Sequence, residues 1–254
     1  MEAVPILEFD MDRRVVVKPS DCIKAQPDIP DACVLCFPHD PIEGLRRAGR
    51  LEVIGEHSSV MGKHPLFSLE HQEKRVCIMQ PGLGAPLAAG FVEELMARGC
   101  RKFVACGSAG TLDADLARGH VVIVTAAVRD EGTSYHYLPP EREVSADPAV
   151  VNALQGVLTA RSVPHVCGKT WTTDAFYRET PGRVSKRRTE GCITVDMEAS
   201  ALLAVAQHHG IPMGVLLCAA DDVSGECWDK RGWKECHDVR SSLLMLAIEC
   251  CLAL

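Results

Sequence analysis

The stretch TVDMEASALLAVA, from Thr194 to Ala206, joins an apolar strand to an apolar helix and places two carboxylates at the junction. Burying a charge without a partner is strongly unfavourable. If the strand continues through Met197, Asp196 and Glu198 share one face of it. If the helix has begun by Glu198, the backbone N–H groups and the dipole of its first turn stabilise an anion there. The stretch therefore indicates either an acidic helix cap or a functional pair of carboxylates.

Apolar runs rich in valine and isoleucine alternate with amphipathic stretches on both sides of this junction. Such alternation is typical of an α/β fold, in which helices cover a sheet. We expect strands at residues 13–18, 32–37, 75–80, 101–107, 121–128, 165–171, 192–197 and 213–220. We expect helices at residues 86–99, 147–161, 180–188, 199–210 and 238–254, where proline and glycine mark several ends.

The composition is that of one globular unit. The chain has 254 residues, of which 47% are hydrophobic, and a net charge of −7. We expect a single domain over residues 1–254, with residues 1–30 as a peripheral amino-terminal extension. The scattered basic residues predict no nucleic acid partner. The short apolar runs and the acidic amino terminus predict no membrane span and no export signal, so we expect a cytoplasmic protein.

Cysteine is abundant but does not form a metal-binding pattern. The 13 cysteines are odd in number, irregularly spaced and mostly set in apolar strings. The single CxxC pair, Cys33 and Cys36, lies in an expected strand, where positions three apart face opposite sides. No second CxxC and no HExxH accompanies it. We expect buried, reduced thiols and no metal site.

Glycine loops after three expected strands are the candidate ligand sites. They read QPGLGAP, CGSAGTL and CAADDVSG, and none is a dinucleotide fingerprint or a nucleophile elbow. Their glycines either let backbone N–H groups approach an anion or a sugar hydroxyl, or simply make turns. The last loop begins with a second acidic pair, Asp221 and Asp222. Two acidic strand ends in one sheet suggest a polar cleft with paired carboxylate roles.

These motifs together resemble the nucleoside phosphorylase and nucleosidase superfamily, which holds uridine phosphorylase, bacterial purine nucleoside phosphorylase and methylthioadenosine nucleosidase. The resemblance runs from about residue 32 to the carboxyl terminus. Its carriers are PGLGAPLAAGFVEEL, GSAGTLDADLARGHVVIVTAAVRDEGTSYHY, TTDAFY, VDMEASALLAVA and AADDVSG. It implies a central mixed, partly barrel-like sheet flanked by helices, and homo-oligomers built from dimers.

The resemblance also implies roles for individual residues. Glu198 matches a glutamate that accepts hydrogen bonds from the secondary ribose hydroxyls, and Met197 a methionine that packs on the sugar. Asp196 stands where relatives usually have glutamate, with a shorter reach. Asp222 matches the aspartate that protonates a purine leaving base, which requires a raised pKa. Further substrate-binding candidates are Phe176 beside the base, or in the core, Tyr177, Arg178, Ser108, Gly107 and Gly84.

The phosphate site departs from the resemblance. Phosphorylase relatives use arginines at positions where this chain has Glu43, Ala105 and a residue near Gly62. His39, Arg46 and Arg129 are candidate replacements, either in a phosphate site or on solvated surfaces. Glu43 instead resembles the water-activating carboxylate of methylthioadenosine nucleosidase.

We therefore expect a pentosyltransferase of purine salvage that cleaves a nucleoside, purine favoured through Asp222, to free base and ribose 1-phosphate. Hydrolysis of the same bond by a nucleosidase is the alternative, and a non-catalytic nucleoside-binding protein is a third. The expected partner is a small-molecule nucleoside. No cofactor is expected, apart from inorganic phosphate as co-substrate of a phosphorylase.

Overall fold

The computed structural model describes residues 4–60 and 62–254, and a ten-stranded mixed sheet organises them. Five strands pair in a closed ring, in the order β5–β10–β6–β8–β9–β5. β1, β4, β3 and β2 extend the sheet outward from β5, and β7 pairs with β6. The strands are β1 (Ala32–Cys36), β2 (Glu52–Ser59), β3 (Gly62–His71), β4 (Lys74–Met79), β5 (Lys102–Thr111), β6 (Val121–Asp130), β7 (Glu143–Ser145), β8 (His165–Thr173), β9 (Cys192–Asp196) and β10 (Met213–Asp222).

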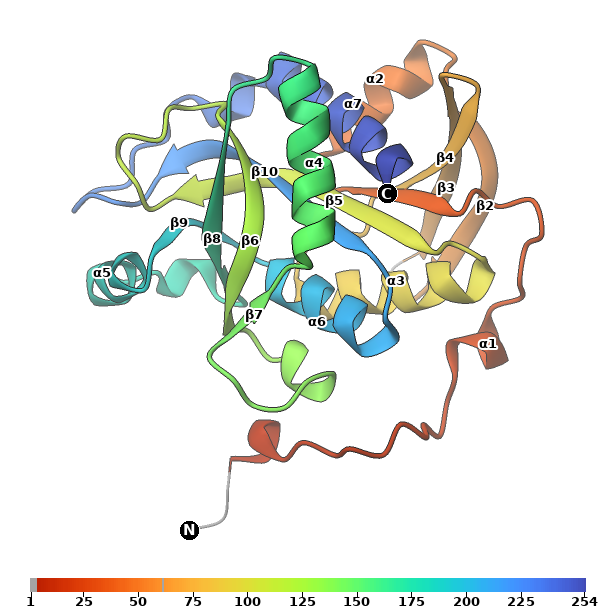
Figure 1. The fold of residues 1–254 in the computed structure, drawn as a ribbon, viewed down its shortest axis with the longest axis horizontal. Helices are drawn as coiled ribbons and strands as arrows, with labels where there is room; N and C mark the ends of the chain where they lie inside the picture. Colours follow the sequence, from red (N-terminus) through yellow and green to blue (C-terminus); the bar gives the residue numbers. More distant parts are fainter. Residues whose placement is uncertain (1–3, 61) are drawn as a thin grey trace.

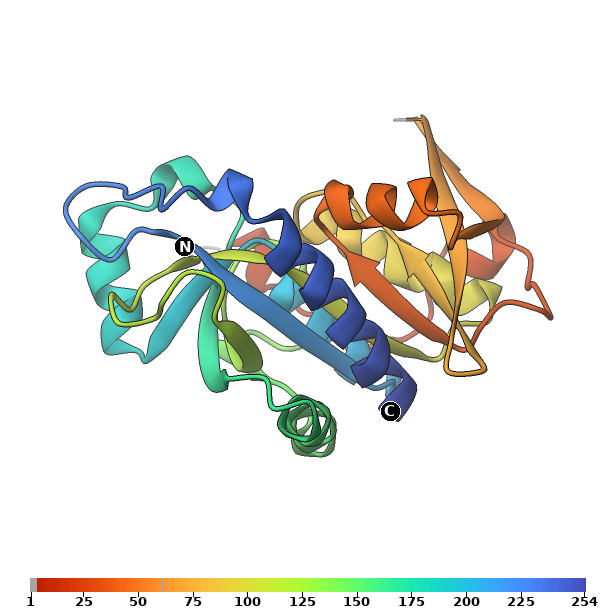
Figure 2. The same cartoon turned by 90° about the horizontal axis from the view of Figure 1, so that it is seen from above.

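Helices cover the sheet in two groups (Figure 1). α3 (Ala85–Arg98) and α6 (Ala199–His209) pack against each other and contribute to one apolar cluster. α4 (Pro148–Ala160) and α7 (His237–Ala253) contribute to a second cluster, and α7 runs along the sheet in the view of Figure 2. The other helical elements are α1 (Pro19–Cys22), α2 (His39–Arg47), α5 (Pro181–Thr189), η1 (Pro5–Leu7), η2 (Ser134–His136), η3 (Phe176–Arg178) and η4 (Trp233–Glu235). The expected α/β fold with a mixed, barrel-like sheet is thereby confirmed.

The five expected helices all form, within one or two residues of their expected bounds. Asp147 caps α4 as its side chain accepts the N–H of Ala149, and Thr180 caps α5 in the same way through Arg183. The expected strand at residues 13–18 is wrong. Val15, Val16 and Val17 are exposed there and pair with no other strand, so β-propensity alone did not make a strand.

The pattern also missed β2, β3 and α2. β2 and β3 form an antiparallel pair at the outer edge of the sheet, where Glu56, His57, Lys63 and His64 interrupt the apolar alternation. α2 is nine residues long and carries only a short apolar face. A strand at a sheet edge is partly solvated, so its sequence is less apolar than that of a central strand.

The thiols lie mostly inside, as the sequence predicted. Nine cysteines are buried, and all thirteen are free thiols. Cys33 belongs to the cluster beneath α3 and α6, whereas Cys36 belongs to the cluster beneath α7. The CxxC pair therefore faces opposite sides of the sheet and cannot chelate one ion.

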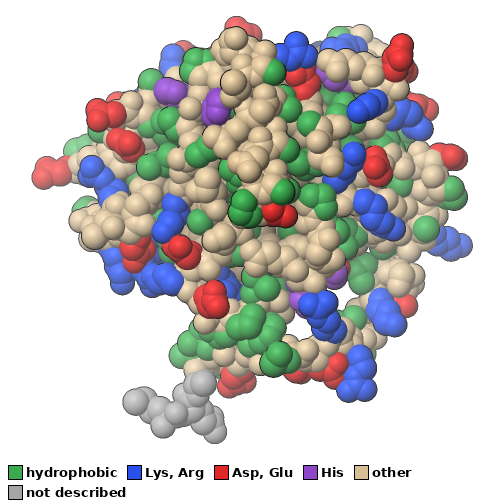
Figure 3. Space-filling model, viewed as in Figure 1, with side chains coloured by type: hydrophobic (Ala, Val, Ile, Leu, Met, Phe, Trp, Pro, Cys, Tyr) green, Lys and Arg blue, Asp and Glu red, His purple; other side chains and the backbone are tan. Residues whose placement is uncertain are grey.

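The outer surface is mixed in charge on the face drawn in Figure 3, where acidic and basic side chains are interspersed. Within residues 4–60 and 62–254, no helix combines the length and the apolar character needed to cross a bilayer.

Gly168 is a point where the closed ring tolerates no side chain. A Cβ built at Gly168 on β8 would lie 2.2 Å from Cδ1 of Ile193 on β9. Gly168→Ala should therefore lower the free energy of unfolding by about 1–3 kcal/mol. Gly156→Ala on the exposed face of α4, where a Cβ meets nothing within 4 Å, should raise it by about 0.5–1 kcal/mol. Urea unfolding of both variants measures this, and equal effects would contradict the predicted packing at Gly168.

Candidate active site

A cavity of about 580 Å³ opens where β5, β9 and β10 end. This volume lies within the range of small-molecule sites, roughly 300–1,000 Å³. The wall is largely apolar and carries four carboxylates, those of Asp196, Glu198, Asp221 and Glu179. Further lining residues are Phe37, Leu83, Gly107, Ser108, Phe176, Tyr177, Met197, Val223, Trp228, Trp233 and Lys234.

Asp196 is a buried structural carboxylate at the end of β9. Its Oδ2 accepts the Thr170 hydroxyl at 2.6 Å and its Oδ1 the Thr172 hydroxyl at 3.1 Å, both from β8. Oδ1 also accepts the N–H groups of Glu198 and Ala199, each at 2.8 Å. Burial raises the pKa of Asp196 and these hydrogen bonds oppose the rise. Asp196 therefore fastens the start of α6 to the sheet, and its acceptor capacity is engaged by the protein.

Glu198 presents the second carboxylate of the opening stretch to the cavity. Its side chain is largely buried, with 7% of the residue exposed. Oε1 accepts the N–H of Gly84 at 2.6 Å, from a loop 114 residues away in the chain. Gly84 has a φ of 98°, a region that glycine reaches without strain. Burial, with the charge of Asp196, raises the pKa of Glu198 to about 8.

Asp221 and Glu179 approach the cavity from two other elements. Asp221 lies near the end of β10, and its Oδ2 accepts the indole N–H of Trp228 at 2.5 Å. Glu179 follows η3 directly and is half-buried. Burial, with the charge of Asp221, raises the pKa of Glu179 to about 7. One side of the cavity thus holds two carboxyl groups, those of Asp221 and Glu179.

Asp222 departs from its expected environment, because it is absent from the lining residues of the cavity. Its Oδ1 accepts the N–H of Ser224 at 2.7 Å, and its Oδ2 pairs with the guanidinium of Arg231. Burial acts to raise the pKa of Asp222, but the Ser224 and Arg231 interactions outweigh it and the pKa lies below its ordinary value. The expectation of a raised pKa is therefore wrong. The pairing of β10 with β5 shifts register between Ala219 and Asp222, and at this irregularity Asp221 lines the cavity while Asp222 pairs with Arg231.

The other substrate-binding candidates divide into two groups. Phe176, Tyr177, Met197, Ser108 and Gly107 line the cavity, whereas Arg178 does not. Phe176 is 45% exposed, so it lies at the cavity wall and not in the core. Gly84 acts indirectly, through its hydrogen bond to Glu198.

The candidates for a phosphate or water site lie outside the cavity wall. Glu43 on α2 is paired with Arg46 and Arg47, whose hydrogen bonds lower its pKa to about 2. His39 Nδ1 contacts the Gln80 side chain at 3.3 Å. Arg129 is buried and donates to the Ser134 hydroxyl and to the carbonyls of Leu138 and Pro139. Each of these groups is already engaged by the protein.

Among the lining residues that carry a charge or an indole ring, the sequence reasoning did not name Glu179, Trp228, Trp233 and Lys234. Glu179 lies close to the TTDAFY motif, so that motif could have identified it as a site candidate. The other three lie in residues 226–236, which follow the last recognised motif and carry no periodic pattern.

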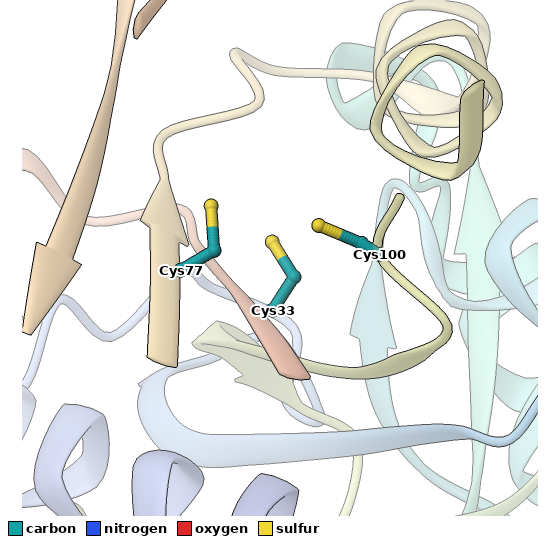
Figure 4. Close-up of side chains that lie close together, drawn as sticks. All are labelled: Cys33, Cys77 and Cys100. Carbon is teal, nitrogen blue, oxygen red and sulfur yellow. The ribbon is translucent and has the colours of Figure 1, made fainter. Parts of the chain in front are cut away.

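Three thiols form a candidate metal centre elsewhere in the sheet (Figure 4). Cys33 on β1 lies opposite Cys77 on β4, and Cys100 follows α3. Their Sγ atoms all lie within 4.8 Å of one another. Thiolates are the ligand form of cysteine. All three residues are fully buried in an apolar cluster, where burial raises the pKa of Cys33 while hydrogen bonds with Cys33 and Cys77 lower the pKa of Cys100 to about 5, so the cluster favours one shared negative charge and not the two or three thiolates of a metal site. Uncompensated thiolate charge is costly there, so we assign these thiols to core packing.

Comparisons with known sequences and structures identify the family of the chain. The sequence profile of the phosphorylase superfamily matches residues 35–243. The chain belongs to the phosphorylase superfamily. Uridine phosphorylase of Thermococcus kodakarensis is 32% identical over 263 residues, covering 96% of this chain and 90% of the relative. Guanosine phosphorylase of Halorubrum lacusprofundi is 28% identical over 191 residues, covering 74% and 77%.

Solved structures of superfamily proteins share the fold. AMP nucleosidase of Bacteroides thetaiotaomicron superposes with a TM-score of 0.69 at 25% identity, covering 88% of this chain and 87% of that one. Uridine phosphorylase of Vibrio fischeri superposes with a TM-score of 0.71 at 22% identity, covering 91% and 95%. The superfamily contains nucleoside phosphorylases and nucleosidases.

Glu198 should make the stability of this superfamily member depend on pH. Its pKa of about 8 in the folded protein exceeds the ordinary value of 4.5, so its contribution is fully present below pH 4.5 and is lost as pH rises through 8. Glu198→Gln keeps the acceptor for Gly84 without the charge. The free energy of unfolding of the variant minus that of the wild type should be larger at pH 9 than at pH 5, by on the order of 3 kcal/mol. Urea unfolding at both pH values measures the difference, with the exposed Glu141→Gln as control; a pH-independent difference would contradict the assignment.

Proposed function

We propose that the protein cleaves the N-glycosidic bond of a nucleoside, with purine nucleosides favoured. The observation that carries the proposal is that Glu198 and Asp221 line one cavity of nucleoside size. A carboxylate for the sugar and a carboxyl group for the base can then act on the two sides of one bond. Membership of the superfamily supports the same reaction class.

In this proposal Glu198 accepts hydrogen bonds from the secondary ribose hydroxyls. Those hydroxyls offset the cost of a largely buried carboxylate, and an analogue without them would leave it unpaired. Met197 packs against the sugar, and Phe176 packs beside the base. The acid that protonates the leaving base is Asp221 and not Asp222, because Asp221 lines the cavity while Asp222 is held by Arg231. A neutral leaving base departs more readily as positive charge develops on the sugar.

We propose water as the acceptor of the ribosyl group. The cavity carries four carboxylates, and Lys234 is the one Lys or Arg among its described lining residues. A phosphate dianion placed here would be desolvated with one cationic side chain available to pair with it, which is costly. The C1′–N bond breaks, water oxygen bonds to C1′, and the products are free base and free ribose.

Phosphorolysis is the second candidate function, supported by relatives named as uridine and guanosine phosphorylases. Ser108 and Gly107 line the cavity and offer a hydroxyl and a backbone amide. The products would then be free base and ribose 1-phosphate.

The two candidates differ in their need for phosphate. We expect purified protein to release free base and free ribose from purine nucleosides in phosphate-free buffer, at a rate that added phosphate does not raise. Separation of ribose from ribose 1-phosphate by ion exchange measures the outcome. Base release that requires phosphate would establish phosphorolysis, and no release from any nucleoside in either buffer would contradict the proposed reaction.

The acid assignment is tested by a pair of neighbouring variants. Asp221→Asn should lower kcat/KM for a purine nucleoside at least about 100-fold, because the leaving base loses its proton donor. The same variant should retain most activity on a nitrophenyl riboside, whose leaving group needs no proton. Asp222→Asn should leave the ratio of the two activities unchanged. A collapse of that ratio in the Asp222 variant alone would return the acid role to Asp222.

The proposal extends to the location, cofactor need, assembly and partner of the protein. We propose a cytoplasmic enzyme of purine salvage that needs no organic cofactor and assembles as a homo-oligomer built from dimers. Its partner is a small-molecule nucleoside. The mixed charge of the face in Figure 3 supports the absence of a nucleic acid partner.

A further inference from the structure

The indole of Trp228 contacts the carboxyl group that serves as the acid of the proposed reaction. Its Nε1–H donates to Oδ2 of Asp221 at 2.5 Å, and both residues line the cavity. The other oxygen, Oδ1, has no hydrogen-bond or ion-pair partner within residues 4–60 and 62–254. Oδ1 lies beside Gly110 on the cavity wall, where a Cβ built on the glycine would be 3.8 Å away. The two oxygens of this carboxyl group therefore have different surroundings.

The backbone on both sides of this contact is fixed. The carbonyl of Asp221 accepts the hydroxyl of Thr111 on β5 at 3.1 Å. Asp222 and Asp229, the next residues of the two segments, exchange backbone hydrogen bonds of 2.8 and 3.0 Å. Arg231 pairs with Asp222 and donates to two carbonyls of the loop after β5. The segment that carries the indole is thus held against the end of β10.

The indole does not need a carboxyl partner to be satisfied. Trp228 is 57% exposed, so water can accept its N–H. Its ring also lies 5.2 Å from Nζ of Lys230. Trp233 lines the same cavity, and its indole N–H has no protein acceptor among the described residues. The contact with Asp221 is therefore a specific placement by the fold and not a requirement of burial.

We propose that Trp228 is a positioning residue, which holds the Asp221 carboxyl group with Oδ1 toward the base. The inference rests on the proposed nucleoside cleavage with Asp221 as its acid. An indole N–H can only donate, so Oδ2 acts as the acceptor and Oδ1 carries the transferable proton. As the C1′–N bond breaks, its electron pair stays with the base and the Oδ1 proton moves to a ring nitrogen. The attacking water releases a proton, which restores the acid.

The same hydrogen bond strengthens during this transfer. Loss of the proton leaves a carboxylate, and an N–H group binds an ionised acceptor more strongly than a neutral one. An interaction that is stronger in the transition state than in the ground state raises kcat and does not raise substrate affinity. Trp228 therefore contributes to turnover through Asp221.

Trp228→Phe removes the N–H and keeps an aromatic ring. The variant should lower kcat for a purine nucleoside about tenfold, with KM within about twofold of wild type. Its kcat for a nitrophenyl riboside should stay within about twofold of wild type, because that leaving group needs no proton. Trp233→Phe is the matched control and should leave the ratio of the two activities unchanged. A wild-type ratio in Trp228→Phe would overturn the inference.

A double-mutant cycle shows whether Trp228 acts through Asp221. In the Asp221→Asn background, Trp228→Phe should change kcat for a purine nucleoside less than about twofold, because no acid remains to be positioned. An undiminished tenfold loss in that background would assign Trp228 a direct role on the substrate and would contradict the positioning role.

The indole N–H signal of Trp228 in NMR provides a readout apart from turnover. The three tryptophans give three such signals, which single Trp→Phe variants assign. The Trp228 proton should exchange with solvent at least about tenfold faster in Asp221→Ala than in wild type, because its acceptor is lost. Equal exchange in both proteins would refute the positioning contact.

The two sets of measurements separate the inference from the proposed reaction. If nucleosides are cleaved and Trp228→Phe has the kcat of wild type, the inference fails while the reaction stands. If no nucleoside is cleaved but exchange at Trp228 depends on Asp221, the reaction fails while the placement of the carboxyl group stands.

Discussion

The arrangement of the active site depends on the buried carboxylate of Asp196. It accepts two threonine hydroxyls from β8 and two backbone N–H groups from the start of α6. These four bonds offset the cost of burying the charge and fasten the helix to the closed ring of strands. Glu198 lies at the fixed end of that helix, and its Oε1 accepts the N–H of Gly84.

Two successive aspartates on β10 have different surroundings, one in the cavity and one in the supporting structure. Asp221 lines the cavity and contacts Trp228, while Asp222 pairs with Arg231 and holds the loop that carries the tryptophan. The two carboxylates lie where the pairing of β10 with β5 shifts register, between Ala219 and Asp222. The scaffold aspartate keeps its charge through its partners, whereas the cavity aspartate shares an apolar surface with Glu179. Two adjacent aspartates therefore have different surroundings: Asp222 supports the loop, and Asp221 lines the cavity.

The sequence by itself determined the fold class, the helices and the junction around residues 194–206. Those features are local. They depend only on neighbours in the chain: apolar periodicity, helix caps such as Asp147, prolines at helix starts and glycines at helix ends. The same reasoning failed at residues 13–18, where three valines had strand propensity but no neighbouring strand to pair with. It also missed the edge strand β2 and its neighbour β3. The resemblance to the superfamily also assigned Glu198 and Met197 to the site, and both line the cavity.

Only the tertiary structure decided which carboxylate faces the cavity. Asp221 and Asp222 are the same residue type at adjacent positions, so the sequence does not distinguish them. The pairing of β10 and the position of Arg231 in a later loop decide which of them faces the cavity. Glu179 joins the site for a similar reason, because η3 and β10 converge in space and are about 40 residues apart in the chain. Local sequence patterns carry information over the length of one strand or helix, whereas the protonation of a carboxyl group depends on every charge and apolar surface that packs around it.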